Sequence, residues 1–390
     1  MPQLTANRLV KIVLHLVFFM SGIVTVLIGQ VLPILARHFS LNDLQVSFFF
    51  PAQFAGSLCG TYLGSRIARK TNLISATILG SSLMATGVLL MNVDLFSICL
   101  IGFLINGAGI GMTLASINMF VLELNPDRSA SALSILNFCW GLGAIVCKPF
   151  VDLWSTSDNI GITTFILAIP LVVFAVLLFL ATDKSKTDTT QTIEAGEAAD
   201  IPIWTMPVAW MIALFNFVHV GFESGVGGWL TTYTGRLDGE PVVPWISPTL
   251  LYFLFFVIGR GFAPALFRFF NENKMLMTGL LIVLLGMVLT LSASTVMALS
   301  LGAAVSGFGT SWIFPTNVAR FSRTFGPAAT RRSAPLFICG TLGAASATWL
   351  IGFISNQTGS LRSGMYILIV CIVLLIVLQI VLARGTAARP

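Results

Sequence analysis

Twelve long apolar runs, separated by short polar segments, are the dominant feature of this sequence. Their approximate bounds are 9–36, 43–67, 72–92, 95–123, 129–153, 160–182, 204–233, 244–270, 274–293, 295–322, 331–356 and 362–383. A helix needs roughly 20 apolar residues to cross a bilayer core of about 30 Å. Charged residues make up only 9% of the 390 residues, against roughly 25% in soluble proteins. We therefore predict an all-α integral membrane protein with twelve transmembrane helices.

The basic residues are distributed unequally between the two sides that twelve spans would define. The side that holds both termini carries 16 of the 21 basic residues, whereas the opposite side carries Arg37, Arg236 and Arg362. Basic residues accumulate in cytoplasmic loops. The net charge of +6 is therefore interpreted as a topology signal, and no nucleic-acid partner is predicted. We predict a multi-pass protein of the cell (inner) membrane with both termini in the cytoplasm.

The two halves of the sequence repeat each other at an almost constant offset of 199 or 200 residues. The matching pairs include Gly22 and Gly221, Gly60 and Gly259, Gly107 and Gly307, and Gly143 and Gly343. We predict two six-helix bundles, residues 1–182 and 204–390, joined by a polar cytoplasmic linker at 183–203. Six spans return the chain to its starting side, so the repeats are parallel. Parallel repeats are typical of alternating-access carriers that bind substrate between their halves.

The segment Leu63–Lys70 resembles the cytoplasmic loop motif of the major facilitator superfamily. Arg66, Arg69 and Lys70 match the basic positions of that motif, while Ser65 replaces its usual aspartate. The chain resembles this superfamily over its whole length, which implies the major facilitator fold of two parallel-repeat bundles. The resemblance also implies that the loop helps to stabilise one conformation, although the missing aspartate weakens that expectation.

Within the superfamily, the chain is most similar to the fucose–galactose–glucose:proton symporter family. The segment His219–Tyr233 is similar to the signature G-x-E-x-x-x-G-x-W-x-x-x-Y of that family, with Glu223 at its acidic position. This resemblance implies transport of a sugar coupled to protons. One departure is clear, because the two acidic residues that couple protons in the fucose permease branch correspond here to Gly29 and Leu114.

Three charged residues fall well inside predicted spans, where an ionisable side chain is a functional candidate. Glu223 is the candidate coupling or substrate-binding carboxylate, with a structural role as the alternative. Arg260 could bind substrate through its forked donors or form an internal ion pair. Lys148 could act on substrate or in a gate, but Asp152 follows it by four residues and could form a local pair with it.

Hydrogen-bonding and aromatic residues on the same spans complete the predicted substrate or coupling site. They are Gln30, Asn118, Asn137, Trp140, His219 and Asn317. Sugars need such donors and acceptors together with aromatic faces that cover their C–H groups. Each residue also has a structural interpretation, since a lone histidine often packs in a core and a tryptophan often anchors a helix end.

We predict a monomeric secondary transporter of a small polar solute, a sugar in the favoured interpretation, driven by an ion gradient of protons. Its partners are the small-molecule substrate and the lipid bilayer. The six cysteines lack the spacing of a metal site, and no nucleotide-binding loop or catalytic constellation occurs. No cofactor, metal or enzymatic activity is therefore predicted. The alternatives are a transporter of organic anions such as sugar acids, a drug/proton antiporter, and a receptor with the same fold.

Overall fold

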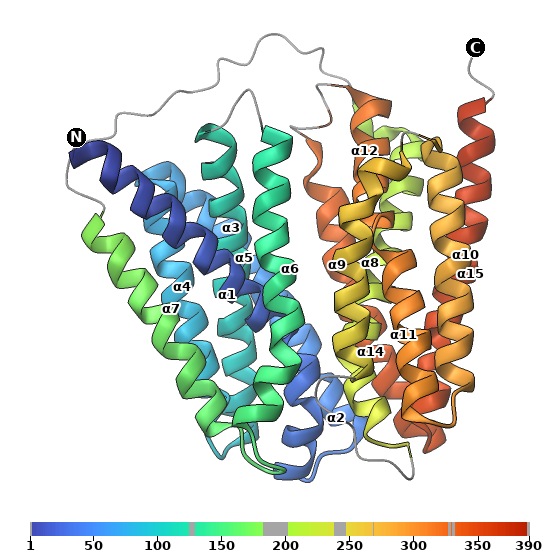
Figure 1. Cartoon of the computed structure of the whole chain (residues 1–390), viewed down its shortest axis with the longest axis horizontal. Helices are drawn as coiled ribbons and strands as arrows, with labels where there is room; N and C mark the ends of the chain where they lie inside the picture. Colours follow the sequence, from blue (N-terminus) through green and yellow to red (C-terminus); the bar gives the residue numbers. More distant parts are fainter. Residues whose placement is uncertain are drawn as a thin grey trace.

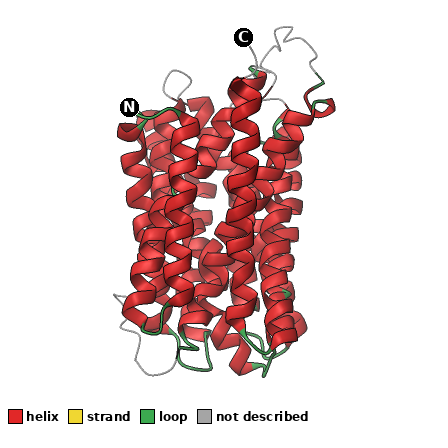
Figure 2. Ribbon diagram, turned by 90° about the vertical axis from the view of Figure 1, so that its right-hand side faces the viewer, coloured by secondary structure: helices red, strands yellow, loops and turns green. Residues whose placement is uncertain are grey.

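The computed structural model describes residues 2–124, 129–181, 202–237, 247–267, 269–326, 329 and 332–387. The first half contains α1 (Pro2–His38), α2 (Asp43–Ser47), α3 (Phe49–Lys70), α4 (Leu73–Leu90), α5 (Phe96–Leu124), α6 (Ser129–Trp154) and α7 (Gly161–Ala181). The second half contains η2 (Ile203–Thr205), α8 (Pro207–Thr234), α9 (Pro248–Leu266), α10 (Glu272–Ser292), α11 (Val296–Thr310), α12 (Ile313–Phe325), α14 (Ala334–Thr358) and α15 (Leu361–Ala387). The described secondary structure is helical (Figure 2).

Each of the twelve predicted spans corresponds to helix in the structure. Within the described ranges, ten helical segments are long and apolar enough to cross a membrane. A shorter apolar helix lies at Pro248–Ala263 of α9, and α3, with 22 residues, is long enough but less apolar. The run 43–67 is divided into α2 and α3, because Asn42 caps a separate short helix through a reciprocal hydrogen-bond pair with Gln45. The run 295–322 is divided into α11 and α12 by a turn at Ser311 and Trp312.

The packing of the helices repeats between the halves, as the glycine offset predicts. In the first half α1 packs on α6, α3 on α5, and α4 on both α5 and α7. In the second half the equivalent pairs are α8 with α14, α9 with α11, and α10 with α11 and α15. Figure 1 shows the two bundles side by side. The predicted linker, residues 183–203, lies almost entirely outside the described residues, so its bounds stay a prediction.

Repeated glycines allow the equivalent helices to come into backbone contact. A Cβ atom on Gly107 of α5 would lie 2.0 Å from the Gln53 carbonyl oxygen of α3, and one on Gly307 of α11 would lie 2.1 Å from the Tyr252 carbonyl oxygen of α9. Helices in membranes associate largely through such close packing. The glycine repeat is therefore first a packing device that builds the same bundle twice.

The two halves contact each other toward one end of the molecule. The start of α1 and the end of α15 share the opposite end (Figure 1), which we call the terminal end; the other is the distal end. Contacts between halves involve α1 with α8, α6 with α9, and α14 with both α2 and α3. The short helix α2 lies at the distal end (Figure 1). Both termini are thus on one side, as twelve spans require.

We expect Gly107→Ala and Gly307→Ala to lower the thermal denaturation midpoint of the purified protein by a few degrees each. The added methyl would meet a backbone carbonyl, and overpacking of this kind costs about 1–3 kcal/mol. Gly261→Ala on α9 is the matched control, because a Cβ there has no neighbour within 4 Å. Equal midpoints for all three variants would contradict the packing role of the repeated glycines.

Candidate functional site: a cavity between the two halves

A cavity of about 130 Å³ lies between the halves, and we call it the central cavity. Its lining combines polar, glycine and aromatic residues from both bundles, namely Thr25, Val26, Ile28, Phe50, Phe54, Trp140, Glu223, Ser224, Gly227, Gly228 and Phe253. Binding sites at the interface of repeats are the rule in carriers of this architecture. The central cavity is therefore the candidate substrate site.

The repeat relates several lining residues of the central cavity to one another. Thr25 and Ser224, Ile28 and Gly227, and Phe54 and Phe253 are each separated by 199 residues. The cavity is thus built from equivalent positions of α1 and α8 and of α3 and α9. Sequence reasoning did not select Phe54 and Phe253, although the offset that relates the glycines also relates these two rings and could have identified them.

Of the described residues that line the central cavity, Glu223 alone has an ionisable side chain. Its side chain is 22% exposed, and its Oε2 lies 3.4 Å from Nε2 of His219, one turn earlier on α8. His219 is fully buried, and within the described part of the chain neither ring nitrogen has a hydrogen-bond partner. Arg260 also interacts electrostatically with Glu223. The carboxylate therefore faces the cavity with two basic side chains behind it.

The other two intramembrane charges have partners within their own halves. Lys148 forms an ion pair with Asp152 on α6, the local pair that the sequence offered as its structural interpretation. The Nε of Arg260 donates to the Ser311 carbonyl oxygen at 3.3 Å, and its guanidinium lies 4.1 Å from the centre of the Phe256 ring. Direct contact of either side chain with substrate stays a prediction.

Of the polar and aromatic residues that were predicted to form the site, Trp140 lines the central cavity. Asn118 and Asn137 each donate to the carbonyl oxygen of the preceding turn, at 2.8 and 2.9 Å. Asn317 is buried in the second half, where it donates to Ile212 on α8. Gln30 lies nearer the distal end. The predicted set is therefore dispersed, and the structure brings Glu223, His219 and Trp140 to the central cavity or its edge.

An ion pair at the distal end connects the halves. Both terminal nitrogens of Arg236 donate to the carboxylate of Asp43, with Nη1 at 2.7 Å from Oδ2, and the Ser355 hydroxyl donates to the same carboxylate. Burial raises the pKa of the Asp43 carboxyl. The hydrogen bonds from Arg236 and Ser355 and the positive charge of Arg236 lower that pKa by more than burial raises it. The net effect is a pKa below the ordinary value, so the carboxylate is ionised at neutral pH.

Backbone contacts and a hydrogen bond reinforce this distal closure. A Cβ on Gly29 of α1 would lie 2.2 Å from the Gly227 carbonyl oxygen of α8, and one on Gly352 of α14 would lie 2.5 Å from Cβ of Ser47. The Thr231 hydroxyl donates to Gln30 Oε1 at 2.7 Å. Sequence reasoning missed this closure, although Arg236 had already been recognised as one of three basic residues on that side.

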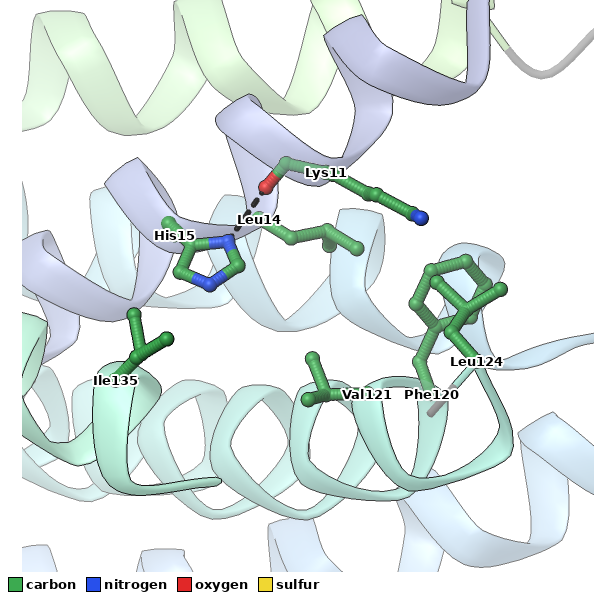
Figure 3. Close-up of a pocket in the computed structure, with 7 residues that line it drawn as sticks. All are labelled: Lys11, Leu14, His15, Phe120, Val121, Leu124 and Ile135. Atoms are coloured by element: carbon green, nitrogen blue, oxygen red, sulfur yellow. Dashed lines mark hydrogen bonds between the residues drawn. The ribbon is translucent and has the colours of Figure 1, made fainter. Parts of the chain in front are cut away.

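At the terminal end, a separate cavity of about 210 Å³ is lined by α1, α5 and α6 of the first half. Figure 3 shows its seven residues, with Lys11 and His15 of α1 beside Phe120, Val121 and Leu124 of α5. His15 Nδ1 is 2.7 Å from the Lys11 carbonyl oxygen. Among the described residues, none from the second half contributes to the lining, in contrast to the central cavity and the distal closure.

The basic residues of the loop motif lie at the end of α3. Arg66, Arg69 and Lys70 are exposed, and the Arg66 guanidinium lies 4.6 Å from the centre of the Tyr62 ring. Among the residues that the structure describes, none of the three forms an ion pair. Ser65, at the usual aspartate position, donates to the Tyr62 carbonyl oxygen instead. The conformational role of this motif therefore stays a prediction.

The 16 basic residues counted on the side of the termini include Arg320, which the structure places in a helix and not in a loop. Arg320 lies on α12, is only 6% exposed and is part of an apolar span. Its Nη2 donates to Gln379 Oε1 and, at 3.5 Å, to Asn273 Oδ1. The apolar run 295–322 extends past Arg320, so this residue belongs to the membrane span although a loop follows shortly after it.

Comparisons with known proteins agree with this architecture. Residues 14–269 match the Major Facilitator Superfamily model. The glucose/mannose transporter GlcP of Bacillus subtilis is 24% identical over 87% of this chain and 86% of its own length, and a glucose/galactose transporter of Brucella abortus is 23% identical over 78% and 77%.

Solved structures show the same fold. A bacterial homologue of the lysosomal transporter Spinster, inward-facing and unoccupied, superposes with a TM-score of 0.81 at 14% identity, covering 97% of both chains. A D-xylose–proton symporter gives a TM-score of 0.77 at 16% identity, covering 96% of this chain and 97% of the other. The predicted resemblance and the all-α fold are thus confirmed. This multi-pass membrane protein belongs to the major facilitator superfamily, a family of transporters rather than enzymes.

Proposed function

We propose that the chain is a secondary transporter that carries a small neutral sugar through the central cavity. The observation that carries this proposal is the Glu223 carboxylate beside the rings of Trp140, Phe54 and Phe253 in one cavity between the halves. A carboxylate accepts hydrogen bonds from sugar hydroxyls, and aromatic faces cover the C–H side of a sugar ring. The names of the two bacterial relatives, both transporters of hexoses, support the same substrate class.

The distribution of charge favours a neutral substrate over an organic anion. The anion hypothesis depends on two intramembrane cations facing a single carboxylate. Lys148 is paired with Asp152, so it is not an uncompensated charge, and Arg260 contacts the Ser311 carbonyl oxygen and the Phe256 ring and does not line the central cavity. A substrate that brings its own negative charge would thus meet the carboxylate of Glu223 without a spare cation. A neutral polyhydroxylated ligand avoids this conflict.

Alternating access is supported by where the halves contact each other. The Asp43–Arg236 pair, the Gln30–Thr231 hydrogen bond and the Gly29 contact all lie on the distal side of the central cavity. Together with the topology that we infer from the basic residues, this describes a state that is closed toward the outer side of the membrane. A single chain supplies both walls of the cavity, in keeping with a monomeric transporter.

Proton coupling is proposed for the Glu223–His219 pair. The two side chains lie 3.4 Å apart at the cavity wall, so a proton bound by the Glu223 carboxylate changes the charge that the substrate meets. The acidic coupling positions of the fucose permease branch are occupied by Gly29 and Leu114, and Glu223 provides a carboxylate on the opposite half instead. A gradient of protons would then drive accumulation of the sugar.

We expect Glu223→Gln to reduce uptake of D-glucose or D-galactose into proteoliposomes at least tenfold at low substrate concentration. Hydrogen bonds to a charged group contribute about 1.5–3 kcal/mol, and each 1.4 kcal/mol is a factor of ten in affinity. Asp94→Asn is the matched control, since this exposed carboxylate pairs with His38 far from the cavity. Wild-type uptake by Glu223→Gln, or faster flux of D-glucuronate than of neutral sugars, would contradict the proposal.

A second experiment separates coupling from binding. With an inward proton gradient we expect the wild type to accumulate sugar and Glu223→Gln to fail, because the amide cannot carry a proton. Sugar counterflow without a gradient is measured on the same vesicles. Counterflow that persists without accumulation assigns Glu223 to coupling, whereas loss of both assigns it to substrate binding. Accumulation equal to that of the wild type overturns proton coupling through Glu223.

We expect Asp43→Asn to open the distal end. The ion pair is partly exposed, so its loss should destabilise the closed state by on the order of 1–2 kcal/mol. Spin labels at Leu95 and Gln357, both exposed near the distal end, measure the opening by pulsed electron resonance in a background without reactive cysteines. We expect a single short distance in the wild type and an added longer population in the variant.

The pH dependence of this closure follows from the lowered pKa of Asp43. Because the pKa of Asp43 is lower in the closed state, ionisation of this carboxylate stabilises that state. The stabilisation is fully present above the ordinary carboxyl pKa of about 3.9, and it is lost as the pH falls through the lowered pKa. The spin-label distance in the wild type should therefore be constant between pH 5 and pH 8. A change within that interval would show that another group controls the closure.

A further inference from the structure

Two adjoining cavities lie at the distal end, outside the central cavity. One has a volume of about 240 Å³ and the other about 150 Å³, and both are lined by Pro33, Arg37, Lys148 and Thr231. Because they share these four residues, we treat them as one space and call it the outer cavity. Its walls come from α1 and α6 of the first half and from α8 and α9 of the second, so it lies between the halves as the central cavity does.

A thin polar partition separates the outer cavity from the central cavity. The Thr231 hydroxyl donates to Gln30 Oε1 at 2.7 Å and lies 2.8 Å from the Thr249 hydroxyl. All three residues line the outer cavity, whereas Ile28 and Gly228 line the central one. With a helical rise of 1.5 Å per residue, Gly228 and Thr231 are separated by only about 4.5 Å along α8. The two cavities are therefore successive compartments of one path.

The charges in the outer cavity are already matched. Lys148 is paired with Asp152. Arg37 donates through Nε and Nη2 to the Ser157 carbonyl oxygen and lies 3.7 Å from Asp158. The remaining polar groups are side-chain hydroxyls and the Gln30 amide. Such a lining offers hydrogen bonds without a net charge that would attract an ion, which suits a neutral molecule rich in hydroxyl groups.

We propose that the outer cavity is a second binding site for the transported solute, a neutral polyhydroxylated molecule of about monosaccharide size. The inference rests on the proposed function and adds a site on the far side of the partition from Glu223. Its two parts, about 240 and 150 Å³, together lie at the lower end of the roughly 300–1,000 Å³ typical of small-molecule sites, which suits an occupant of this size.

Occupancy of the outer cavity would also help the partition to open. Separation of α1 from α8 deprives Gln30 Oε1 of the Thr231 donor, and an unpaired buried amide oxygen is unfavourable. A ligand hydroxyl in the outer cavity can donate to the same oxygen. One hydrogen bond then replaces another. Solute bound in the outer cavity thus favours the conformation in which α1 and α8 separate and the central cavity becomes accessible.

The stoichiometry of sugar binding tests this proposal. We use the full chain in lipid nanodiscs with radiolabelled D-galactose and, in parallel, D-glucose as probes, and expect two bound molecules per chain at saturation. Thr156 is an exposed residue that lines the outer cavity. Thr156→Trp should fill the cavity and reduce binding to one molecule, while Thr86→Trp, the control at an exposed position of α4 that lines neither cavity, should keep two. Glu223→Gln should remove the other molecule.

A second measurement covers the case in which the tryptophan disturbs folding. In a background of Glu223→Gln, alkylation of Thr156→Cys by an impermeant maleimide should slow severalfold when saturating D-galactose or D-glucose is present. One bound molecule in the wild type with unprotected alkylation would overturn the outer site, and intact counterflow would then leave the proposed function standing. Stronger protection by D-glucuronate would overturn the neutral assignment. If the protein neither binds nor transports any of these sugars, both proposals are overturned.

Discussion

The cost of placing charge in a bilayer determines where the charged side chains of this molecule find partners. Lys148 pairs with Asp152 in the first half, and Glu223 lies beside His219 in the second. These intramembrane partners belong to a single half, so they can stay together while the halves move. The Asp43–Arg236 pair joins the halves instead, and the Arg236 side chain is 44% exposed. In the alternating-access mechanism that we propose this pair would have to break, and it lies where water can solvate its members, which lowers the cost of separation.

The sequence repeat explains much of the scaffold and part of the site. The offset of 199 predicts that α1 and α8, and α3 and α9, take equivalent places, and Thr25 with Ser224 and Phe54 with Phe253 line the central cavity accordingly. The repeat fails at one informative position, because the residue equivalent to Glu223 is Val24. Glu223 therefore has no acidic counterpart in the first half, and Trp140 of α6 has no counterpart from α14 in the lining, so the cavity is only partly symmetric.

The sequence predicted the membrane spans well but did not predict which polar residues line the central cavity, and the difference has a physical reason. Apolar length determines whether a helix spans the membrane, and it can be read locally. The role of Asn118 or Asn137 depends on whether its side-chain amide faces a cavity or donates to the carbonyl oxygen one turn back on its own helix. Either arrangement gives the amide a hydrogen-bond partner, so the sequence does not distinguish them. The contact between Asp43 and Arg236 joins residues 193 positions apart, so only the docking of the two bundles creates it.

The composition of the partition shows why such a closure can open. Gly29 and Gly227 bring the backbones of α1 and α8 together with no intervening side chain. The rings of Phe50 on α3 and Trp229 on α8 also pack across the halves, with centroids 5.9 Å apart, so opening uncovers some apolar surface. Beside these contacts lies the hydrogen-bonded group of Gln30, Thr231 and Thr249, whose bonds water or a hydroxylated solute can replace one for one. An apolar seal of the same thickness would lose its burial energy on opening without any such replacement. Glycine contacts combined with exchangeable hydrogen bonds therefore keep α1 and α8 closely packed in the closed state and lower the free energy needed to separate them.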